Sequence, residues 1–188
     1  MSEEKKDVSR ALALSLKEKM LTTPFEKITI KQITDGAGVI RVTFYNHFQD
    51  KYDLLGHIVE SEILEPVGIL LKNNMYKEAL TLIFTNIKKD SEFYMRAVKI
   101  EGQNSFEQIT EECIYKLLLD LFSERSSGRP HPTHSWVTVD SLARYYSKSM
   151  TFVVMYWIRT GMEASPEEVA GVYEYIVTRS LWDVLEEL

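Results

Sequence analysis

The stretch FEKITIKQITDGAGVIRVTFYNHFQDKYDLL, residues 25–55, decides how this sequence is interpreted. Its apolar spacing predicts two short helices, Ile30–Ala37 and Ile40–His47, on either side of a tight turn. Thr29-x-x-Gln32 is a capping-box pattern, in which a hydroxyl and an amide satisfy backbone N–H groups at a helix start. Gly38 suits the left-handed turn that ends a helix. The stretch therefore predicts a helix-turn-helix, a unit whose second helix enters the major groove of DNA.

The side chains of this unit divide between a small core and an outer face. The apolar positions predict the core, which consists of Ile28, Ile33, Val39, Phe44 and Phe48. The outward residues of the second helix are then Arg41, Val42, Thr43, Tyr45 and His47. An outward arginine can hydrogen-bond guanine O6 and N7 with both arms of its guanidinium, so we expect Arg41 to read bases.

The run from Thr29 to Leu55 resembles the TetR (tetracycline-repressor-like) family of transcriptional regulators. The matching residues are Ile33, Ala37-Gly38-Val39, Thr43-Phe44-Tyr45-x-His47-Phe48 and Asp50-Lys51-x-x-Leu54-Leu55. The resemblance implies a homodimer that binds double-stranded DNA at a near-palindromic operator and represses transcription until an effector binds. The C-terminal run RTGMEASPEEVA, residues 159–170, is similar to the dihydroxyacetone kinase regulator subgroup, which leaves activation open.

Eight residues are expected to contact the operator. Tyr45 and His47 resemble the family's phosphate-contacting pair, and Val42 or Thr43 could meet a thymine methyl group. The full set is Thr29, Lys31, Arg41, Val42, Thr43, Tyr45, His47 and Lys51. The alternative for each is a solvated helix surface or, for His47, a structural histidine.

Three positions depart from the commonest pattern of the family. Ile40 stands where an N-capping residue is usual, and Val42 stands where glycine or alanine is usual. Gly36 lies inside the last turn of a helix, where it should cost about 1 kcal/mol relative to alanine. These departures put the base preference in question more than DNA binding itself.

Helical spacing continues through the remaining sequence, so the expected fold is all-α with about nine helices. Beyond the helix-turn-helix, the expected helices are 7–21, a helix capped by Asp50 and bent or restarted at Pro66, 75–88, 91–100, 105–123, 135–160 and 165–187. The polar segment 123–134 is the predicted loop. We expect residues 1–50 to form a three-helix DNA-binding domain and residues 51–188 a helical effector-binding and dimerisation domain.

Aromatic residues are dense in the second domain, and two interpretations are open for them. The residues expected to line an effector pocket are Phe84, Phe93, Tyr94, Tyr115, Phe152 and Tyr156. The residues expected at a two-fold dimer interface are Tyr146, Trp157, Tyr173, Ile176 and Trp182. Alternatively, this domain binds a partner protein instead of a small molecule, with the segment 123–134 and the helix 91–100 forming a gate or a docking face.

The formal net charge of −6 over 188 residues argues against nucleic acid until it is divided along the chain. Residues 1–60 are charge-balanced, and all of the net acidity follows them. We find no nucleophile–base pair and no phosphate-binding glycine loop, so we expect no enzyme activity and no cofactor. Cys113 is the single cysteine, and His57, His131 and His134 lack a clustered carboxylate, so no metal site is expected.

The N-terminal segment lacks the apolar run of a signal peptide. The most apolar stretch, 150–158, is far shorter than the roughly 18 residues that a bilayer requires. We therefore expect a cytoplasmic protein without membrane contact.

Overall fold

The structure, a computed structural model, describes residues 3–126 and 134–186 and contains helices but no strand within them. The all-α prediction is therefore confirmed. The N-terminal elements are α1 (Glu3–Met20), the 3-10 turn η1 (Phe25–Lys27), α2 (Ile30–Ala37) and α3 (Arg41–Tyr45). The following elements are α4 (Lys51–Ile58), the π-helical turn η2 (Val59–Leu64), the 3-10 turn η3 (Glu65–Val67), α5 (Gly68–Lys72), α6 (Tyr76–Lys89), α7 (Ser91–Ala97), α8 (Phe106–Ser126), α9 (Val139–Arg159), α10 (Pro166–Thr178) and α11 (Leu181–Glu186).

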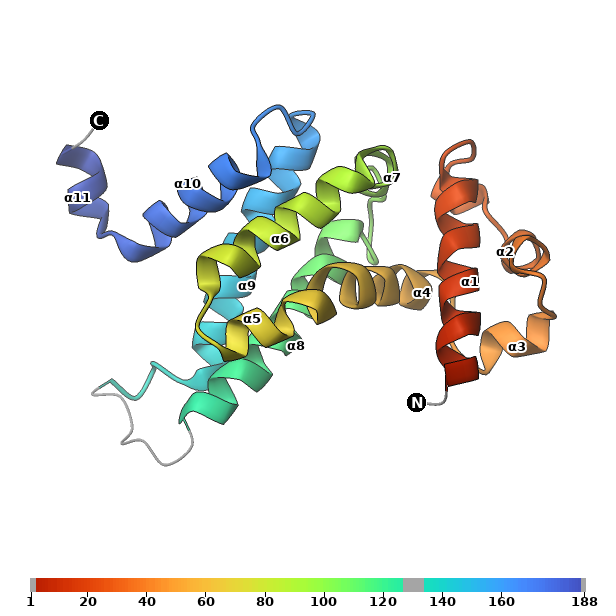
Figure 1. Cartoon of the computed structure of the whole chain (residues 1–188), viewed down its shortest axis with the longest axis horizontal. Helices are drawn as coiled ribbons and strands as arrows, with labels where there is room; N and C mark the ends of the chain where they lie inside the picture. The colour runs from red at the N-terminus through yellow and green to blue at the C-terminus, as the bar shows by residue number, and fades with distance from the viewer. Residues whose placement is uncertain (1–2, 127–133, 187–188) are drawn as a thin grey trace.

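Helices α1–α3 form one end of the molecule, and α4 leads from them to the other helices (Figure 1). Leu12, Leu16 and Met20 repeat every fourth residue and bury one face of α1, as the spacing predicts. α4 packs against both α1 and α8, and buried residues from both sides of position 50 belong to one continuous apolar cluster. The division at residue 50 stays a prediction.

Gly36 has a packing role that the helix-propensity argument does not contain. The Ser15 hydroxyl of α1 donates a 2.8 Å hydrogen bond to the Ile33 carbonyl of α2. A Cβ atom added at Gly36 would lie 2.3 Å from that hydroxyl oxygen, closer than real Cβ contacts. The glycine therefore allows α1 and α2 to approach each other, which offsets its poor helix propensity.

The helix that begins after Asp50 is divided in a way that the sequence argument does not anticipate. We expected the helix to bend or restart at Pro66; a new helix, α5, does start just after Pro66, but the departure from the regular α-helix begins earlier, at the π-helical turn η2. Within this turn the Ser61 hydroxyl donates to the His57 carbonyl at 2.6 Å, a bond that competes with the regular helix ladder. Pro66 then lies in η3, and α5 follows.

The C-terminal helix is also divided. We expected one helix over 165–187, but α10 ends at Thr178 and Arg179 has an extended backbone. Ser180 and Asp183 then cap α11: the Ser180 backbone N–H donates to the Asp183 carboxylate at 3.0 Å, and the Asp183 N–H donates to the Ser180 hydroxyl at 3.2 Å. Residue 187 lies outside the described residues.

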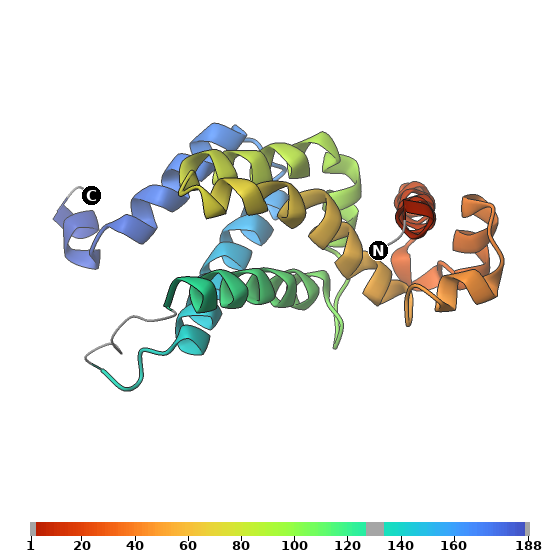
Figure 2. The same ribbon diagram turned by 60° about the horizontal axis from the view of Figure 1, so that its bottom comes forward.

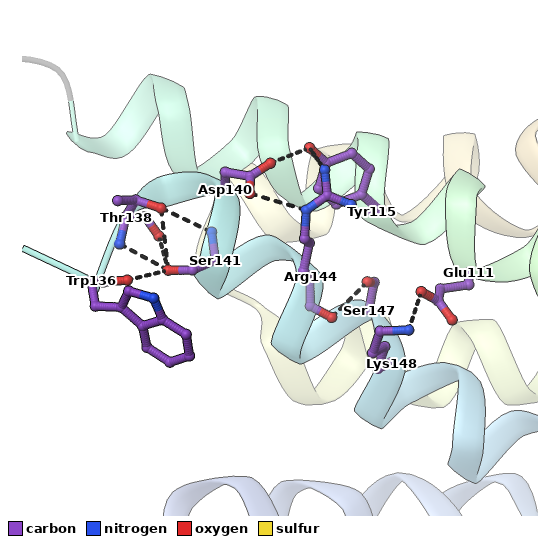
Figure 3. A network of polar contacts seen from close by, with 9 residues as sticks. All are labelled: Glu111, Tyr115, Trp136, Thr138, Asp140, Ser141, Arg144, Ser147 and Lys148. Carbon is purple, nitrogen blue, oxygen red and sulfur yellow. Dashed lines mark hydrogen bonds and ion pairs between the residues drawn. The ribbon is translucent and has the colours of Figure 1, made fainter.

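α8 packs mainly against α9, and α10 packs against α6; Figure 2 shows α8 beneath the layer of α5, α6 and α10, with α9 running from α8 up to that layer. Polar side chains join the edges of α8 and α9 (Figure 3). Lys148 pairs with Glu111 at 2.9 Å, and the Tyr115 hydroxyl donates to Asp140 at 2.6 Å.

The predicted loop 123–134 begins later than expected, because α8 extends to Ser126 and includes the first residues of that segment. Residues 127–133 lie outside the described part of the chain. In that part, every helix is too short or too polar to span a bilayer.

Lys17 joins α1 to the larger group of helices. Its ammonium nitrogen lies 2.6 Å from a carboxylate oxygen of Glu62 in η2 and 2.6 Å from one of Asp90, the residue before α7. Burial alone lowers the pKa of Lys17, but the hydrogen bonds and charges of Asp90 and Glu62 outweigh it and raise that pKa above its ordinary value. The lysine is therefore charged at neutral pH and holds two carboxylates together.

We predict that Lys17→Met lowers the free energy of unfolding by about 1–3 kcal/mol, because it leaves two carboxylates facing each other without a cation. The loss is smaller than for a fully buried pair, since Glu62 and Asp90 keep contact with water. Urea unfolding measures it. Lys6→Met, an exposed position on the same helix, is the control and should change stability little; equal stability of the two variants would contradict the assignment.

Candidate functional site

The outward face of α3 carries a charged and an aromatic side chain beside exposed apolar ones. The Arg41 guanidinium donates to the Tyr45 hydroxyl at 3.1 Å and lies 5.5 Å from the centre of its ring. Val42 is 65% exposed and Ile40 70% exposed, although both are branched and apolar. An exposed set of this kind on a short helix that follows a tight turn offers hydrogen bonds and methyl contacts to base edges.

The turn before α3 has the geometry that the sequence predicts. Gly38 has a φ of 68°, in the left-handed region, and its N–H donates to carbonyls of the last turn of α2. Ile40 occupies the N-cap of α3 without a side-chain hydrogen bond, as expected from its side chain. Phe44 and Phe48 are buried, so they hold α3 against the core while Arg41 and Tyr45 face outward.

The start of α2 is a complete capping box. The Gln32 N–H donates to the Thr29 hydroxyl oxygen at 3.2 Å, and the Thr29 N–H donates to the Gln32 side-chain oxygen at 2.8 Å. Within the first turn of α2, exposed Lys31 pairs at 2.7 Å with Asp35, which lies one turn further along. Both predicted residues therefore lie on the surface at the N-terminal end of α2, where the helix dipole favours an anion.

His47 and Thr43 are half-buried and lie less openly than the rest of the predicted set. The Nδ1 atom of His47 lies 3.0 Å from the Ser9 hydroxyl of α1. Burial, and then the charges of Lys5 and His57, lower the pKa of His47, so the ring is neutral at physiological pH. If Ser9 donates to Nδ1, the Nε2–H remains as the outward donor.

Lys51 has a structural environment that the sequence argument did not foresee. Its ammonium donates to three backbone carbonyls: Phe25 at 2.7 Å, Glu26 at 3.0 Å and Ile28 at 3.0 Å. Since an ammonium has three N–H donors, this geometry uses all of them within the protein. Burial lowers the pKa of Lys51. A phosphate contact would therefore require Lys51 to share or break one of these bonds.

A largely apolar cavity of about 440 Å³ lies among η2, α6, α7, α8, α9 and α10. The size falls in the range of small-molecule sites, roughly 300–1,000 Å³. Its lining includes Val59, Ile63 and Leu64 of η2, the same turn that carries Glu62 toward Lys17. Cavity and N-terminal helices are thus joined through one short segment.

The aromatic residues predicted for a pocket are mostly elsewhere. Tyr94 lines the cavity, but Phe84 and Phe93 are buried in the core outside its lining, and Tyr115 bonds Asp140 on the α8–α9 edge. Phe152 and Tyr156 are 66% and 62% exposed and stack on each other at the surface. The reason is helical phase: the cavity face of α9 carries Tyr146, Met150, Val154 and Ile158, and a residue two positions away points about 160° from it.

The residues predicted for a dimer interface divide as well. Tyr146 and Tyr173 line the cavity. Trp157 is buried, donates its ring N–H to the Ala164 carbonyl at 3.0 Å and packs edge-on against Phe84. Ile176 and Trp182 are exposed, as an interface in the isolated chain requires. The surface apolar stripe is formed instead by Leu142, Tyr145, Phe152 and Tyr156 on α9, with Val172 and Ile176 on α10.

Two further residues of the cavity escaped the sequence argument. Thr110 of α8 is buried, and Arg125 lies at the other end of that helix, where it donates to Asn74 at 2.8 Å and to the Leu71 carbonyl at 2.9 Å. Thr110 follows Phe106 by four residues, a spacing that places it on the cavity face. It was not predicted because only aromatic residues were considered as lining, and threonine is polar. Lys17, Glu62 and Asp90 have no sequence signal, because Lys17 is 45 and 73 residues from its partners.

Within the described residues no group of three or more His, Cys, Asp or Glu side chains could hold a metal ion; His131 lies outside them. Burial raises the pKa of the Cys113 thiol to about 12, so it remains protonated at neutral pH. A protonated thiol is neither a nucleophile nor a metal ligand.

We predict that Lys51→Met lowers the free energy of unfolding by about 1–2 kcal/mol, because three carbonyls lose their donor. Lys31→Met, which removes an exposed pair screened by water, should leave it nearly unchanged. Chemical denaturation of both variants measures the difference. Unchanged stability in Lys51→Met, together with weaker DNA binding, would return Lys51 to the role of a phosphate contact.

Comparisons with known proteins agree with this geometry. Residues 74–179, more than half of the chain, match the TetR-family domain described as "Transcriptional regulator C-terminal region". A curated relative, the HTH-type dhaKLM operon transcriptional activator DhaS of Lactococcus lactis, is 25% identical over 92 residues. That alignment covers 49% of this chain and 49% of DhaS, so the chain spans about half the length of this relative.

Solved structures share the fold over nearly the whole chain. The dihydroxyacetone kinase operon activator DhaS has a TM-score of 0.58 at 19% identity and covers 91% of this chain and 94% of its own. FadR of Thermus thermophilus, a TetR-family repressor solved with lauroyl-CoA, has a TM-score of 0.58 at 16% identity, with 94% of both chains covered. NalD of Pseudomonas aeruginosa, the secondary repressor of the MexAB-OprM efflux pump, has a TM-score of 0.56 at 19% identity, covering 90% and 93%. This chain belongs to the TetR family of transcriptional regulators.

Proposed function

We propose that the chain acts as a homodimeric, ligand-responsive regulator that binds a near-palindromic DNA operator. The observation that carries the proposal is the outward face of α3, where Arg41, Tyr45 and Val42 lie exposed on a short helix braced by buried Phe44. Family membership gives the regulatory class, and this face is where base contacts would form.

The proposed DNA contacts fall into two groups. Arg41, Val42 and Thr43 read or flank the bases, whereas Thr29, Lys31, Tyr45 and His47 contact phosphates. The neutral ring of His47 serves as a hydrogen-bond donor rather than as a cation. Lys51 contributes to DNA binding indirectly, because its three hydrogen bonds to backbone carbonyls hold the turn before α2 in place.

The double variant Arg41→Ala, Tyr45→Ala is predicted to bind its operator about 10–100-fold more weakly than the wild-type protein. This is the range expected for the loss of one bidentate base contact. The operator is first selected by the wild-type protein from random-sequence duplexes, and fluorescence anisotropy then measures affinity. Lys116→Ala, which removes an exposed cation on α8, is the control for overall charge. Full affinity of the double variant would rule out this face, and failure to select any duplex would rule out the function.

The homodimer is supported by the exposed stripe of α9 and α10. Leu142, Tyr145, Phe152 and Tyr156 repeat along one side of α9, and Val172 and Ile176 are separated by one turn of α10. Large exposed apolar side chains that repeat along a helix face are typical of an interaction site. A second copy is the proposed occupant, because a two-fold dimer presents two reading helices to successive major grooves about 34 Å apart.

Phe152→Glu is predicted to convert the dimer into a monomer of 21.8 kDa, because it would bring two carboxylates into an apolar interface. Sedimentation equilibrium measures the mass. Ile69→Glu, which charges an exposed apolar residue of α5 outside the stripe, should leave the dimer intact. A Phe152→Glu variant that remains dimeric would show that the exposed stripe is not the dimer interface.

Ligand response is supported by the connection from the cavity to α1. Val59, Ile63 and Leu64 of η2 line the cavity, and Glu62 of the same turn pairs with Lys17 of α1. A ligand that binds one arrangement of η2 better than another would shift the position of Glu62 and, through Lys17, of the reading helices. The size and the apolar lining of the cavity favour a small molecule over the alternative of a partner protein at this domain.

We further propose repression as the sign of regulation and a cytoplasmic location, since the operator is DNA. Among the similar proteins, NalD and FadR are described as repressors and DhaS as an activator. Transcription in vitro from the selected operator, with and without protein, distinguishes the two signs.

A further inference from the structure

Two buried hydroxyl groups in the lining of the cavity have no hydrogen-bond partner. The end of the cavity where they lie is called its closed end. Tyr94 of α7 is 2% exposed and Thr110 of α8 is 5% exposed, and both residues line the cavity. Neither hydroxyl has a partner in the protein. Phe106, one turn before Thr110, lies 6.0 Å from the Tyr94 ring centre, so the two hydroxyls belong to the same region. A buried polar group without a partner typically costs about 1–3 kcal/mol, which a ligand could recover.

The third unpartnered hydroxyl among the described residues, Thr151, provides a contrast. It is buried on α9 but does not line the cavity. Tyr94 and Thr110 therefore differ from it in facing a space large enough to hold a molecule that could bond them.

The cavity is elongated. Its lining follows α8 from Phe106 to Arg125, or about 28 Å of helix axis at 1.5 Å per residue, whereas a sphere of about 440 Å³ is only about 9 Å across. Phe106 and Tyr94 are buried at one end, and Tyr76, Arg125 and Thr178 are partly or fully exposed at the other. We call this elongated space the channel; its lining is buried at the end of Tyr94 and more exposed at the end of Arg125.

The charges around the closed end disfavour an anion. Glu62 and Asp90 share the single cation Lys17, so this cluster carries a net charge of −1. Burial, reinforced by the charges of Glu62 and Asp90, raises the pKa of Tyr94 well above its ordinary value, so its phenol stays neutral and donates its proton. A carboxylate placed there would be desolvated and repelled, whereas a neutral oxygen would accept the Tyr94 hydrogen bond.

The open end does not reverse this preference. Arg125 already donates to Asn74 and to the Leu71 carbonyl and lies against the Tyr76 ring, and Glu174 is the acidic residue of the same lining. The guanidinium therefore already has partners within the protein, and one acidic residue of the lining balances its charge in the total.

We infer that the cavity binds a neutral, elongated, mainly aliphatic molecule whose one hydrogen-bonding oxygen reaches Tyr94 and Thr110. The inference rests on the proposed ligand response and specifies its ligand class. The alkyl part fills the apolar channel along α8, and the oxygen, as a hydroxyl, carbonyl or ether, bonds the two buried hydroxyls. Binding at this end places the ligand against η2 and beside the Lys17 cluster.

The test uses three probes of ten carbons each, titrated by isothermal calorimetry at pH 7.5 into the full chain without DNA. 1-Decanol is elongated and neutral, decanoate is elongated and anionic, and 1-adamantanol is neutral but compact. We expect 1-decanol to bind at least tenfold more tightly than either of the others. Equal or tighter binding of decanoate would overturn the charge argument, equal binding of 1-adamantanol would overturn the shape argument, and no binding of 1-decanol would overturn the inference.

A variant tests the two hydroxyls directly. Tyr94→Phe with Thr110→Val removes both unpartnered oxygens at nearly constant volume, so the variant should fold with at least wild-type stability. We expect it to bind 1-decanol about tenfold more weakly and decanoate no more weakly than wild type. Tyr115→Phe, which lies on the same helix outside the cavity, should bind 1-decanol like wild type.

Wild-type affinity of the double variant for 1-decanol would overturn the role of the hydroxyls. Because these titrations contain no DNA, their failure leaves operator binding untouched. Conversely, a chain that binds 1-decanol but selects no duplex would refute the proposed function and keep the ligand class.

Discussion

The arrangement of this molecule depends on one shared cation. Lys17 projects from the first helix between Glu62 and Asp90 and keeps the two carboxylates within 2.6 Å of its nitrogen. Without it, η2 and the junction of α6 and α7 would present like charges to each other. The ammonium is partly shielded from water, so its attraction for the carboxylates is less screened than that of an exposed pair. It therefore fixes how the N-terminal helices meet the larger helical group.

The same ion pairs also connect the cavity with the N-terminal helices that carry the exposed face of α3. Glu62 lies in the π-helical turn η2, and the apolar residues of that turn line the cavity. π-helical turns in α-helices often occur at functional sites, because their extra residue can be accommodated in more than one way. On the other side of Lys17, α1 covers the core that supports α3, with Ser15 bonded to α2 at the close approach allowed by Gly36. The exposed face of α3 and the cavity are thus linked by packed helices.

The exposed face of α3 could be predicted from local sequence because its determinants are local. The capping box at Thr29 and Gln32, the left-handed Gly38 and the buried pair Phe44 and Phe48 all act within a few residues of each other. The aromatic residues of the C-terminal helices could not be sorted in this way. On α9, positions that differ by two residues point to opposite sides, and the sequence does not say which side meets the cavity. Lys51 was similarly ambiguous, since its carbonyl partners are 23–26 residues away.

The sequence by itself determined the all-α class, the helix-turn-helix and the family resemblance, because hydrophobic period and capping chemistry are read over single turns of helix. Only the tertiary structure decided that Tyr94 and Thr110 face a channel, that Phe152 and Tyr156 lie on the surface, and that Lys17 joins α1 to η2 and Asp90. Each of these depends on which helix faces pack together, and contacts between residues far apart in the chain leave no periodic trace in its sequence.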